Sequence, residues 1–189
     1  MQELSLNLNT RDKKGRSNLQ SPLPLEIERK YLIRYPDIKQ MEQMKGYSKT
    51  EIAQTYIEYE KDGLHGRIRK RGINGEYKYT LTCKGDLTSV TRIEIEKEIS
   101  ETEYERLLKT AKKGFSTVYK ERHCFEYSGL LYEIDVYPFW SDRAIMEAEV
   151  QSEDTQIPVP PCISVIKEVT DDKRYRNSAL ARQIFSEPI

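Results

Sequence analysis

Apolar and polar side chains alternate with a period of two along most of the chain, which is the pattern of strands that bury one face and expose the other. The alternation predicts strands over residues 25–34, 50–60, 64–71, 76–84, 90–99, 116–127, 130–137 and 144–151. Short segments rich in Gly, Asn, Asp and Ser separate most of these strands. Because such segments have the length of hairpin turns, we expect a largely antiparallel sheet.

Three segments interrupt the alternation and predict helices. Residues 36–46 carry a proline at an early helical position. Residues 100–114 begin with a capping box, Ser100 to Glu103, and end at a glycine. Residues 178–186 form a third candidate near the end of the chain. The fold class is therefore mainly β with a few flanking helices, and eight strands of this length can close into a barrel, which removes exposed edges.

The polar stretch at the start of the chain lacks periodicity. We expect a disordered tail over residues 1–22 and one domain over residues 23–189. The 31 basic and 31 acidic side chains balance, so the basic excess that marks a nucleic-acid binder is missing. No apolar run approaches the roughly 20 residues of a membrane span. Cys83, Cys124 and Cys162 lack metal-type spacing and predict free thiols in a reducing cytoplasm.

Charged side chains share one face of nearly every predicted strand, because residues i and i+2 of a strand point the same way. The acidic members of these faces are Glu26, Glu28, Glu94, Glu96, Glu98, Glu133, Asp135, Glu147 and Glu149. The basic members are Lys30, Arg67, Arg69, Arg71, Lys78, Lys84, Lys120 and Arg122. Most strands thus carry one sign, whereas a face that merely contacts water usually mixes signs.

Two interpretations of this face are open. Antiparallel sheets often leave one face in water, and each strand taken alone fits that description. If the sheet closes with the charged face inward, it makes a lumen whose ions must be neutralised, because burying unpaired ions is costly. Direct pairing of acidic with basic groups would be purely structural. Carboxylate pairs also suit Mg²⁺ or Mn²⁺, and clustered Arg and Lys suit phosphate oxygens, so the lumen also fits a metal-bound polyphosphate.

Short motifs along the chain favour the lumen. They are EIERK (26–30), QTY (54–56), RIR (67–69), TCK (82–84), RIEIE (92–96), KER (120–122), YEIDVY (132–137), EAE (147–149) and EVTDDKRYRNSALA (168–181). In this order they resemble the CYTH domain family, the triphosphate tunnel metalloenzymes, and are most similar to its short bacterial members. The resemblance implies a closed eight-stranded antiparallel β-barrel, or tunnel, with charged side chains inside. It also implies metal-dependent hydrolysis, with Mg²⁺ or Mn²⁺, of a triphosphate, most often inorganic tripolyphosphate.

The same resemblance assigns roles to individual residues. The metal ligands that it implies are Glu26, Glu28, Asp135, Glu147 and Glu149. The substrate-binding residues that it implies are Lys30, Arg67, Arg69, Lys84, Lys120, Arg122 and Lys173. Tyr56 and Lys30 would be catalytic, although a phenol with a pKa of about 10 is a poor base unless nearby cations lower that value. Glu94 and Glu96 would position basic side chains, and Arg174 would help to close the tunnel.

Three classes of function are open at this point. In a hydrolase, water attacks a terminal phosphorus of tripolyphosphate, or of an organic triphosphate such as a nucleotide or thiamine triphosphate. In an adenylyl cyclase, the 3′-hydroxyl of ATP attacks the α-phosphorus instead. In a non-catalytic binder of polyphosphate or nucleotide, the acidic pairs would gain little. We therefore expect a small-molecule triphosphate as partner, no nucleic acid and no membrane, and a monomer or homodimer.

Overall fold

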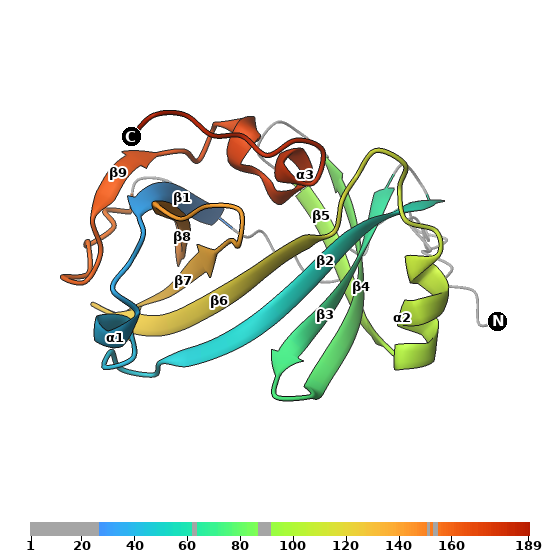
Figure 1. The fold of residues 1–189 in the computed structure, drawn as a ribbon, viewed down its shortest axis with the longest axis horizontal. Helices are drawn as coiled ribbons and strands as arrows, with labels where there is room; N and C mark the ends of the chain where they lie inside the picture. The colour runs from blue at the N-terminus through green and yellow to red at the C-terminus, as the bar shows by residue number, and fades with distance from the viewer. Residues whose placement is uncertain (1–26, 62–63, 87–91, 151, 153–154) are drawn as a thin grey trace, which may run out of the picture.

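The computed structural model describes residues 27–61, 64–86, 92–150, 152 and 155–189 (Figure 1). Within them, nine strands form one antiparallel sheet in the order β5-β4-β3-β2-β6-β7-β8-β1-β9. The strands are β1 (Ile27–Arg34), β2 (Ser48–Lys61), β3 (Leu64–Ile73), β4 (Glu76–Asp86), β5 (Arg92–Ile99), β6 (Val118–Tyr127), β7 (Leu130–Val136), β8 (Arg143–Val150) and β9 (Val165–Glu168). The predicted mainly β fold is confirmed, while the predicted tail over residues 1–22 lies outside the described residues.

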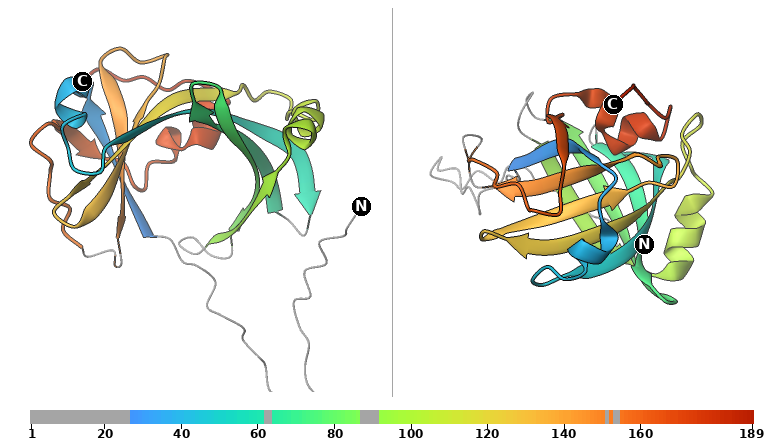
Figure 2. Two further views of the ribbon diagram at one scale, coloured as in Figure 1. Left: turned by 90° about the horizontal axis from the view of Figure 1, so that it is seen from below. Right: turned by 60° about the vertical axis from the view of Figure 1, so that its left-hand side comes forward.

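The sheet is strongly curved but does not close. Its order begins with β5 and ends with β9, and no pairing joins these two strands in the described part of the chain. The strands follow an arch whose two ends are not joined, and we call the concave side of this arch the trough (Figure 2). The prediction of a closed eight-stranded barrel is therefore wrong. One physical reason is that β9 pairs with the second edge of β1 at Tyr31, Leu32 and Ile33, so part of the edge that an eight-stranded barrel would join to β5 is already paired.

Tight turns set the register of the hairpins. Asn74–Gly75 joins β3 to β4 with φ values of 55° and 90°, and Ser128–Gly129 joins β6 to β7 with 49° and 80°. Positive φ at both central residues is typical of two-residue hairpin loops, and it suits Asn and Gly. The second turn fixes the pairing that brings Arg122 of β6 opposite Asp135 of β7.

The helices are shorter than the sequence predicts. α1 (Ile38–Met41) is a single turn capped by Asp37, and α3 (Asn177–Leu180) follows the 3₁₀ turn η1 (Lys173–Tyr175). α2 (Glu101–Leu108) begins with the predicted capping box, in which the Ser100 hydroxyl accepts from the Glu103 N–H (3.2 Å). It ends well before Gly114, because the next segment pairs with β2: the Lys112 N–H donates to the Tyr56 carbonyl (2.8 Å).

Apolar clusters cover the convex face of the sheet, opposite the trough. One cluster includes Tyr132 and Met146 and packs against Met41 of α1. A second joins Ile68 of β3 to Leu107 of α2. Figure 2 shows α1 and α2 outside the curve of the sheet, so the concave face is free of both helices. No helix among the described residues is long and apolar enough to cross a membrane.

A third apolar cluster closes one end of the trough. Leu32, Val118 and Ile145, which lie on the concave face, pack with Tyr175 and Leu180 of the C-terminal segment. The left view of Figure 2 shows this segment through the arch of the sheet, at its far end. The charged part of the concave face therefore lies next to this apolar cluster.

Tyr132 leads to a prediction about alkaline stability. Its side chain is buried, and its hydroxyl donates a hydrogen bond to the Pro158 carbonyl (2.5 Å). Burial raises the pKa of Tyr132 to about 12, whereas the pKa of tyrosine in an unfolded chain is about 10. The folded state therefore holds this proton more tightly. Its contribution to stability is complete below the unfolded pKa and is lost as the pH rises towards the folded pKa.

We expect Tyr132→Phe to lose stability less steeply than wild type as the pH rises from about 10 to about 12. The difference between the two urea-unfolding profiles should grow by about 2 kcal/mol across that window. Tyr119→Phe, at an exposed tyrosine of β6, is the matched control and should follow wild type. Identical slopes for Tyr132→Phe and wild type would contradict the assignment.

Candidate active site

The register of the sheet gathers the predicted charged residues on the concave face of the trough. Lys30 of β1 lies opposite Glu147 of β8, and Glu28 lies opposite Glu149. The other pairs on this face are Glu133 with Glu147, Arg122 with Asp135, Gln54 with Arg69, Tyr56 with Arg67, and Thr82 with Glu96. The residues between them point to the convex clusters. The period-two rule therefore predicted correctly which side chains share a face.

Arg122 is the centre of the acidic half of this face. Its Nε and Nη2 donate to the two carboxylate oxygens of Asp135, both at 2.7 Å. Nη2 also donates to Glu147 (2.7 Å), and Nη1 donates to Glu133. Lys120 forms a second ion pair with Asp135. One guanidinium thus holds three carboxylates together at the base of the trough.

Lys30 links this network to the more exposed residues. Its ammonium lies 2.6 Å from a Glu147 oxygen and 3.3 Å from a Glu28 oxygen. The side chain of Glu147 is 6% exposed, whereas that of Glu28 is 46% exposed. Glu149, opposite Glu28, is also exposed. Among the carboxylates around Lys30 and Arg122, Glu28 and Glu149 are therefore the most accessible to water and ligands.

Burial and charge act against each other in the pKa values of this network. Burial alone would raise the pKa of Asp135, but Lys120 and Arg122 hold it well below its usual range. Burial, together with the charge of Arg122, lowers the pKa of Lys120 to about 8, although Asp135 opposes this shift. Burial also disfavours the charged form of Lys30, yet Glu147 and Glu28 raise its pKa. Asp135 and Lys30 are thus held in their charged forms at neutral pH.

The basic half of the face is built on β2 and β3. Arg67 is buried, and the Arg69 Nε donates to the Gln54 side-chain oxygen (3.0 Å). The amide of Gln54 in turn donates to the Tyr56 hydroxyl (2.9 Å). Glu96 lies 3.7 Å from Arg69 and accepts a hydrogen bond from Thr82 (3.0 Å). Gln54 therefore connects a phosphate-binding candidate to the predicted catalytic tyrosine.

Tyr56 keeps its proton at neutral pH. Burial raises its pKa and outweighs the opposite effects of Arg67, Arg69 and Lys30. The sequence suggested that nearby cations would lower this pKa. These cations do lie close enough to act on it, but their effect is smaller than that of burial. In this arrangement the phenol is a hydrogen-bonding group rather than a base.

Most of the predicted site residues lie together on the concave face. The residues that the structure brings together are Glu28, Lys30, Tyr56, Arg67, Arg69, Lys120, Arg122, Asp135, Glu147 and Glu149. Glu26 lies outside the described residues, as do the side chains of Lys84 and Glu94. Lys173 lies in η1 and lines a cavity together with Tyr56. Arg174 is exposed and paired with Asp172 (2.5 Å).

The acidic residues differ in how well they suit a metal ion. In the part of the chain that the structure describes, no three His, Cys, Asp or Glu side chains meet closely enough to form a metal site. Asp135 has both oxygens occupied by Lys120 and Arg122, which makes it the least suited. Glu28 and Glu149 present two accessible carboxylates, which fits Mg²⁺ or Mn²⁺ bound by one or two carboxylates together with substrate phosphates.

Sequence reasoning missed one residue of this site, Gln54, and placed Glu133 on the charged face without giving it a role. Gln54 is fully buried between Arg69 and Tyr56, and Glu133 pairs with Arg122. Each lies two positions from a predicted site residue on the same strand, Gln54 from Tyr56 and Glu133 from Asp135, and so points to the same face. Gln54 is neutral, and so the sorting of strands by charge gave it no weight.

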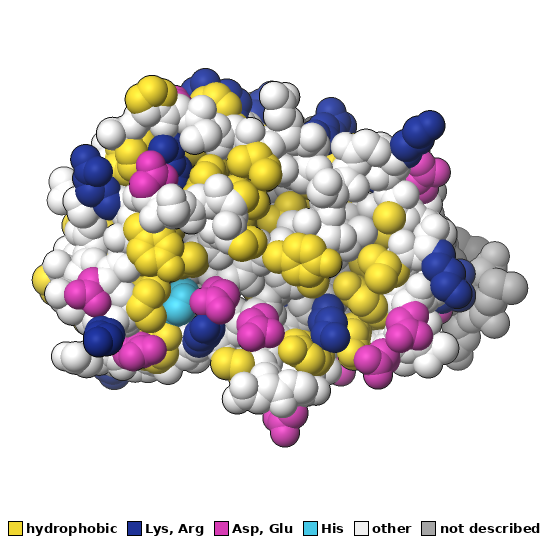
Figure 3. Space-filling model, viewed as in Figure 1, with side chains coloured by type: hydrophobic (Ala, Val, Ile, Leu, Met, Phe, Trp, Pro, Cys, Tyr) yellow, Lys and Arg dark blue, Asp and Glu magenta, His cyan; other side chains and the backbone are white. Residues whose placement is uncertain are grey.

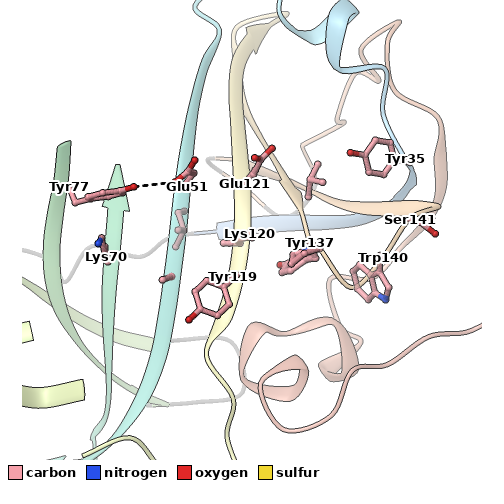
Figure 4. Close-up of a pocket in the computed structure, with 14 residues that line it drawn as sticks. Tyr35, Glu51, Lys70, Tyr77, Tyr119, Lys120, Glu121, Tyr137, Trp140 and Ser141 are labelled. Atoms are coloured by element: carbon pink, nitrogen blue, oxygen red, sulfur yellow. Dashed lines mark hydrogen bonds between the residues drawn. The ribbon is translucent and has the colours of Figure 1, made fainter. Parts of the chain in front are cut away.

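A larger cavity, of about 730 Å³, lies on the convex face and is not the active-site candidate. Tyr77 and Lys70 line one side, and Tyr35 and Trp140 line the other, with β2 between them (Figure 4). Figure 3 shows the mixture of apolar and charged side chains on this face. Its lining carries two acidic and two basic side chains, Glu51, Glu121, Lys70 and Lys120, among apolar residues, and so has no excess of positive charge for a polyanion.

Comparison with known proteins agrees with the motifs of the sequence. The model of the CYTH domain matches residues 24–158. The inorganic triphosphatase of Nitrosomonas europaea is 35% identical over 162 residues, which are 84% of this chain and 98% of that protein. The inorganic triphosphatase of Acetivibrio thermocellus is 30% identical over 161 residues, 85% of this chain and 95% of that protein. A crystal structure of the inorganic triphosphatase NE1496 covers 84% of this chain and 95% of its own at 33% identity, with a TM-score of 0.56.

The ion pairs of Asp135 lead to a prediction about folding. Asp135→Asn leaves Lys120 and Arg122 buried without their closest counter-charge, so we expect it to lower the free energy of unfolding by about 3–5 kcal/mol. Glu28→Gln removes a carboxylate that is 46% exposed and should change stability by less than about 0.5 kcal/mol. Urea unfolding of both variants measures the difference. Equal stabilities would show that the network does not depend on Asp135.

Proposed function

The chain belongs to the CYTH domain family, and on that premise we propose that it hydrolyses inorganic tripolyphosphate to diphosphate and phosphate with Mg²⁺ or Mn²⁺. The observation that supports this most strongly is the composition of the concave face. It carries the accessible carboxylates Glu28 and Glu149 on β1 and β8, and the guanidinium groups of Arg67 and Arg69 on β3. Two relatives at 35% and 30% identity bear the name inorganic triphosphatase, and each alignment covers most of both chains.

In this proposal the divalent cation is held at the exposed carboxylates. Glu28 and Glu149 are its ligands, with Glu26 of the same motif as a third candidate outside the described residues. Glu147 can join them if it exchanges one of its contacts with Lys30 or Arg122. Asp135 supports the site indirectly, by fixing Lys120 and Arg122 in place. When bound, the cation supplies charge neutralisation of the phosphates and activation of the attacking water.

The basic side chains bind and orient the substrate. Arg67 and Arg69 bind phosphate oxygens, with Lys84 and Lys173 as further candidates. Lys120 and Arg122 join them if they exchange a contact with a carboxylate for one with the phosphate. Lys30, held between Glu28 and Glu147, directs its ammonium at the reacting phosphate and stabilises the charge that develops there. The leaving diphosphate remains in contact with the guanidinium groups, which favours in-line displacement because phosphoryl transfer depends mainly on positioning and charge stabilisation.

Tyr56 acts as a hydrogen-bond donor to a phosphate oxygen in this scheme. Its raised pKa argues against a role as general base at neutral pH. A bound polyanion would raise that pKa further, because a negative charge nearby disfavours the phenolate.

The remaining expectations about the cellular setting are part of the same proposal. The three cysteines are free thiols in the structure, which is consistent with a reducing cytoplasm. The partner is a small-molecule triphosphate, and the protein acts as a monomer or a homodimer.

A panel of substrates tests the proposed reaction. Purified protein is incubated with tripolyphosphate, ATP or thiamine triphosphate, each with Mg²⁺ or Mn²⁺, and the products are identified. We expect free phosphate and diphosphate from tripolyphosphate at the highest rate. Formation of cyclic AMP from ATP would instead identify an adenylyl cyclase, and binding without turnover of any of the three would identify a phosphate binder.

Two variants separate metal binding from phosphate binding. Glu28→Gln should lower kcat for tripolyphosphate by about 100-fold or more while the protein stays folded, because an accessible metal ligand is lost. Arg69→Ala should mainly raise KM, by about 10-fold, because a charged hydrogen-bond donor is lost. Glu42→Gln, an exposed residue beside α1, is the control. Undiminished turnover by Glu28→Gln would show that the proposed metal ligands are wrong.

A further inference from the structure

The cavity of about 730 Å³ on the convex face takes no part in the proposed reaction, apart from Lys120, whose ammonium pairs with Asp135 in the trough. Its volume is that of a site for a small organic molecule, which is roughly 300–1,000 Å³. We call it the convex pocket, after five residues of its lining, Glu51, Lys70, Tyr77, Tyr119 and Trp140. The strands β2, β3, β4 and β6 and the segment after β7 contribute these side chains (Figure 4).

Lys70 and Glu51 have opposite charges and line the same pocket, but they do not pair with each other. The Lys70 ammonium lies 4.1 Å from the centroid of the Tyr77 ring, and the Glu51 carboxylate accepts a hydrogen bond from the Tyr77 hydroxyl (3.3 Å). Neither side chain has an ion-pair partner among the residues that the structure describes. Tyr77 therefore holds a cation at its ring and an anion at its hydroxyl, and both charges remain available to a ligand.

Glu121 of β6 makes the surroundings of Glu51 more negative. The two residues lie directly opposite each other in the pairing of β2 with β6, and both line the convex pocket. Like charges that face each other across two strands are unfavourable. The Lys49 ammonium, 2.9 Å from a Glu121 oxygen, offsets the charge of Glu121. A positive group of a ligand bound at Glu51 would offset the other charge of this acidic pair.

Aromatic side chains form the other side of the convex pocket. Tyr119 is 60% exposed and Tyr35 is 46% exposed, although both carry large rings. Figure 4 shows Tyr119 and Trp140 across β2 from Lys70 and Tyr77. Rings that line a concave space bury apolar surface of a ligand and so favour its binding there. The convex pocket thus combines an unpaired cation and an unpaired anion on one side with an aromatic surface on the other.

We propose that the convex pocket binds a free amino acid with an apolar or aromatic side chain. Glu51 binds the α-ammonium group, Lys70 binds the α-carboxylate, and Tyr119 and Trp140 contact the side chain. A ligand with one charge would leave either Glu51 or Lys70 without a counter-charge, and a polyanion would be repelled by Glu51 and Glu121. The inference does not depend on the proposed function, because the proposed hydrolysis takes place on the opposite face of the sheet.

Trp140 supplies the signal for a binding experiment, because it is the only tryptophan in the sequence and lines the convex pocket. L-phenylalanine, its N-acetyl derivative and its amide are titrated into the full chain at about pH 6, below the pKa of an α-amino group. Tryptophan fluorescence and calorimetry follow the binding. The N-acetyl derivative lacks the ammonium group, the amide lacks the carboxylate, and all three keep the ring. We expect phenylalanine to bind saturably and each derivative to bind about 10-fold more weakly, because each loses one charged contact.

Two variants assign the two charges to their residues. Glu51→Gln should weaken the binding of phenylalanine and of its amide by about 10-fold, and should leave the N-acetyl derivative unchanged. Lys70→Gln should weaken phenylalanine and the N-acetyl derivative to a similar extent, and should leave the amide unchanged. The matched control Lys39→Gln/Glu42→Gln also removes one cation and one anion, both exposed at α1 and outside the lining of the convex pocket. It should bind all three probes as the wild type does.

The outcomes separate this inference from the proposed function. Absence of saturable phenylalanine binding would overturn the inference. Equal affinities of the wild type for the three probes would also overturn it, because they would identify an apolar site that does not recognise charge. The comparison of probes uses the wild type, and so it decides the question even if a variant is unstable. Hydrolysis of tripolyphosphate is assayed separately, and its absence would overturn the proposed function but not the amino-acid site.

Discussion

Each ion that is buried on the concave face needs a counter-charge, and the trough is organised around that constraint. Asp135 is fully enclosed and remains ionised because Lys120 and Arg122 surround it. Arg122 is in turn divided among three carboxylates, and so it cannot move without leaving several of them exposed to an apolar environment. Depth within the trough therefore decides the role of an acidic residue. The deep carboxylates hold the basic residues in position, and the shallow ones are accessible to a cation.

The sequence predicted the strands well because their determinants are local. Alternation and turn residues located each of β1–β8 to within two residues at the ends that the structure describes. The closed barrel was wrong because closure depends on which edge meets which, and β9 is too short, at four residues, to show a period. The helices were too long because their ends are set by tertiary contacts, such as the pairing of Lys112 with Tyr56. Helix propensity and capping residues predict the start of a helix well. They do not predict an end that is set by contacts with a strand distant in the sequence.

The candidate site was predictable in its membership and less so in its chemistry. Strand parity, with the family motifs, placed Glu28, Lys30 and Arg69 on one face. Parity could not distinguish Asp135, whose oxygens are both occupied, from Glu149, which is exposed, because burial depends on the curvature of the whole sheet. The pKa of Tyr56 was also beyond reach, since it depends on how far burial exceeds the effect of the neighbouring cations. The face of the sheet on which a side chain lies can be predicted from the sequence. How deeply the side chain is buried cannot.

The free edge of β5 has a consequence for how ligands reach the trough. In a sealed cylinder, a linear polyanion would have to thread in end-first, and each product would leave through a narrow mouth. Here the described part of the sheet has no pairing between β5 and β9, so the strands described do not by themselves enclose a ligand on the concave face.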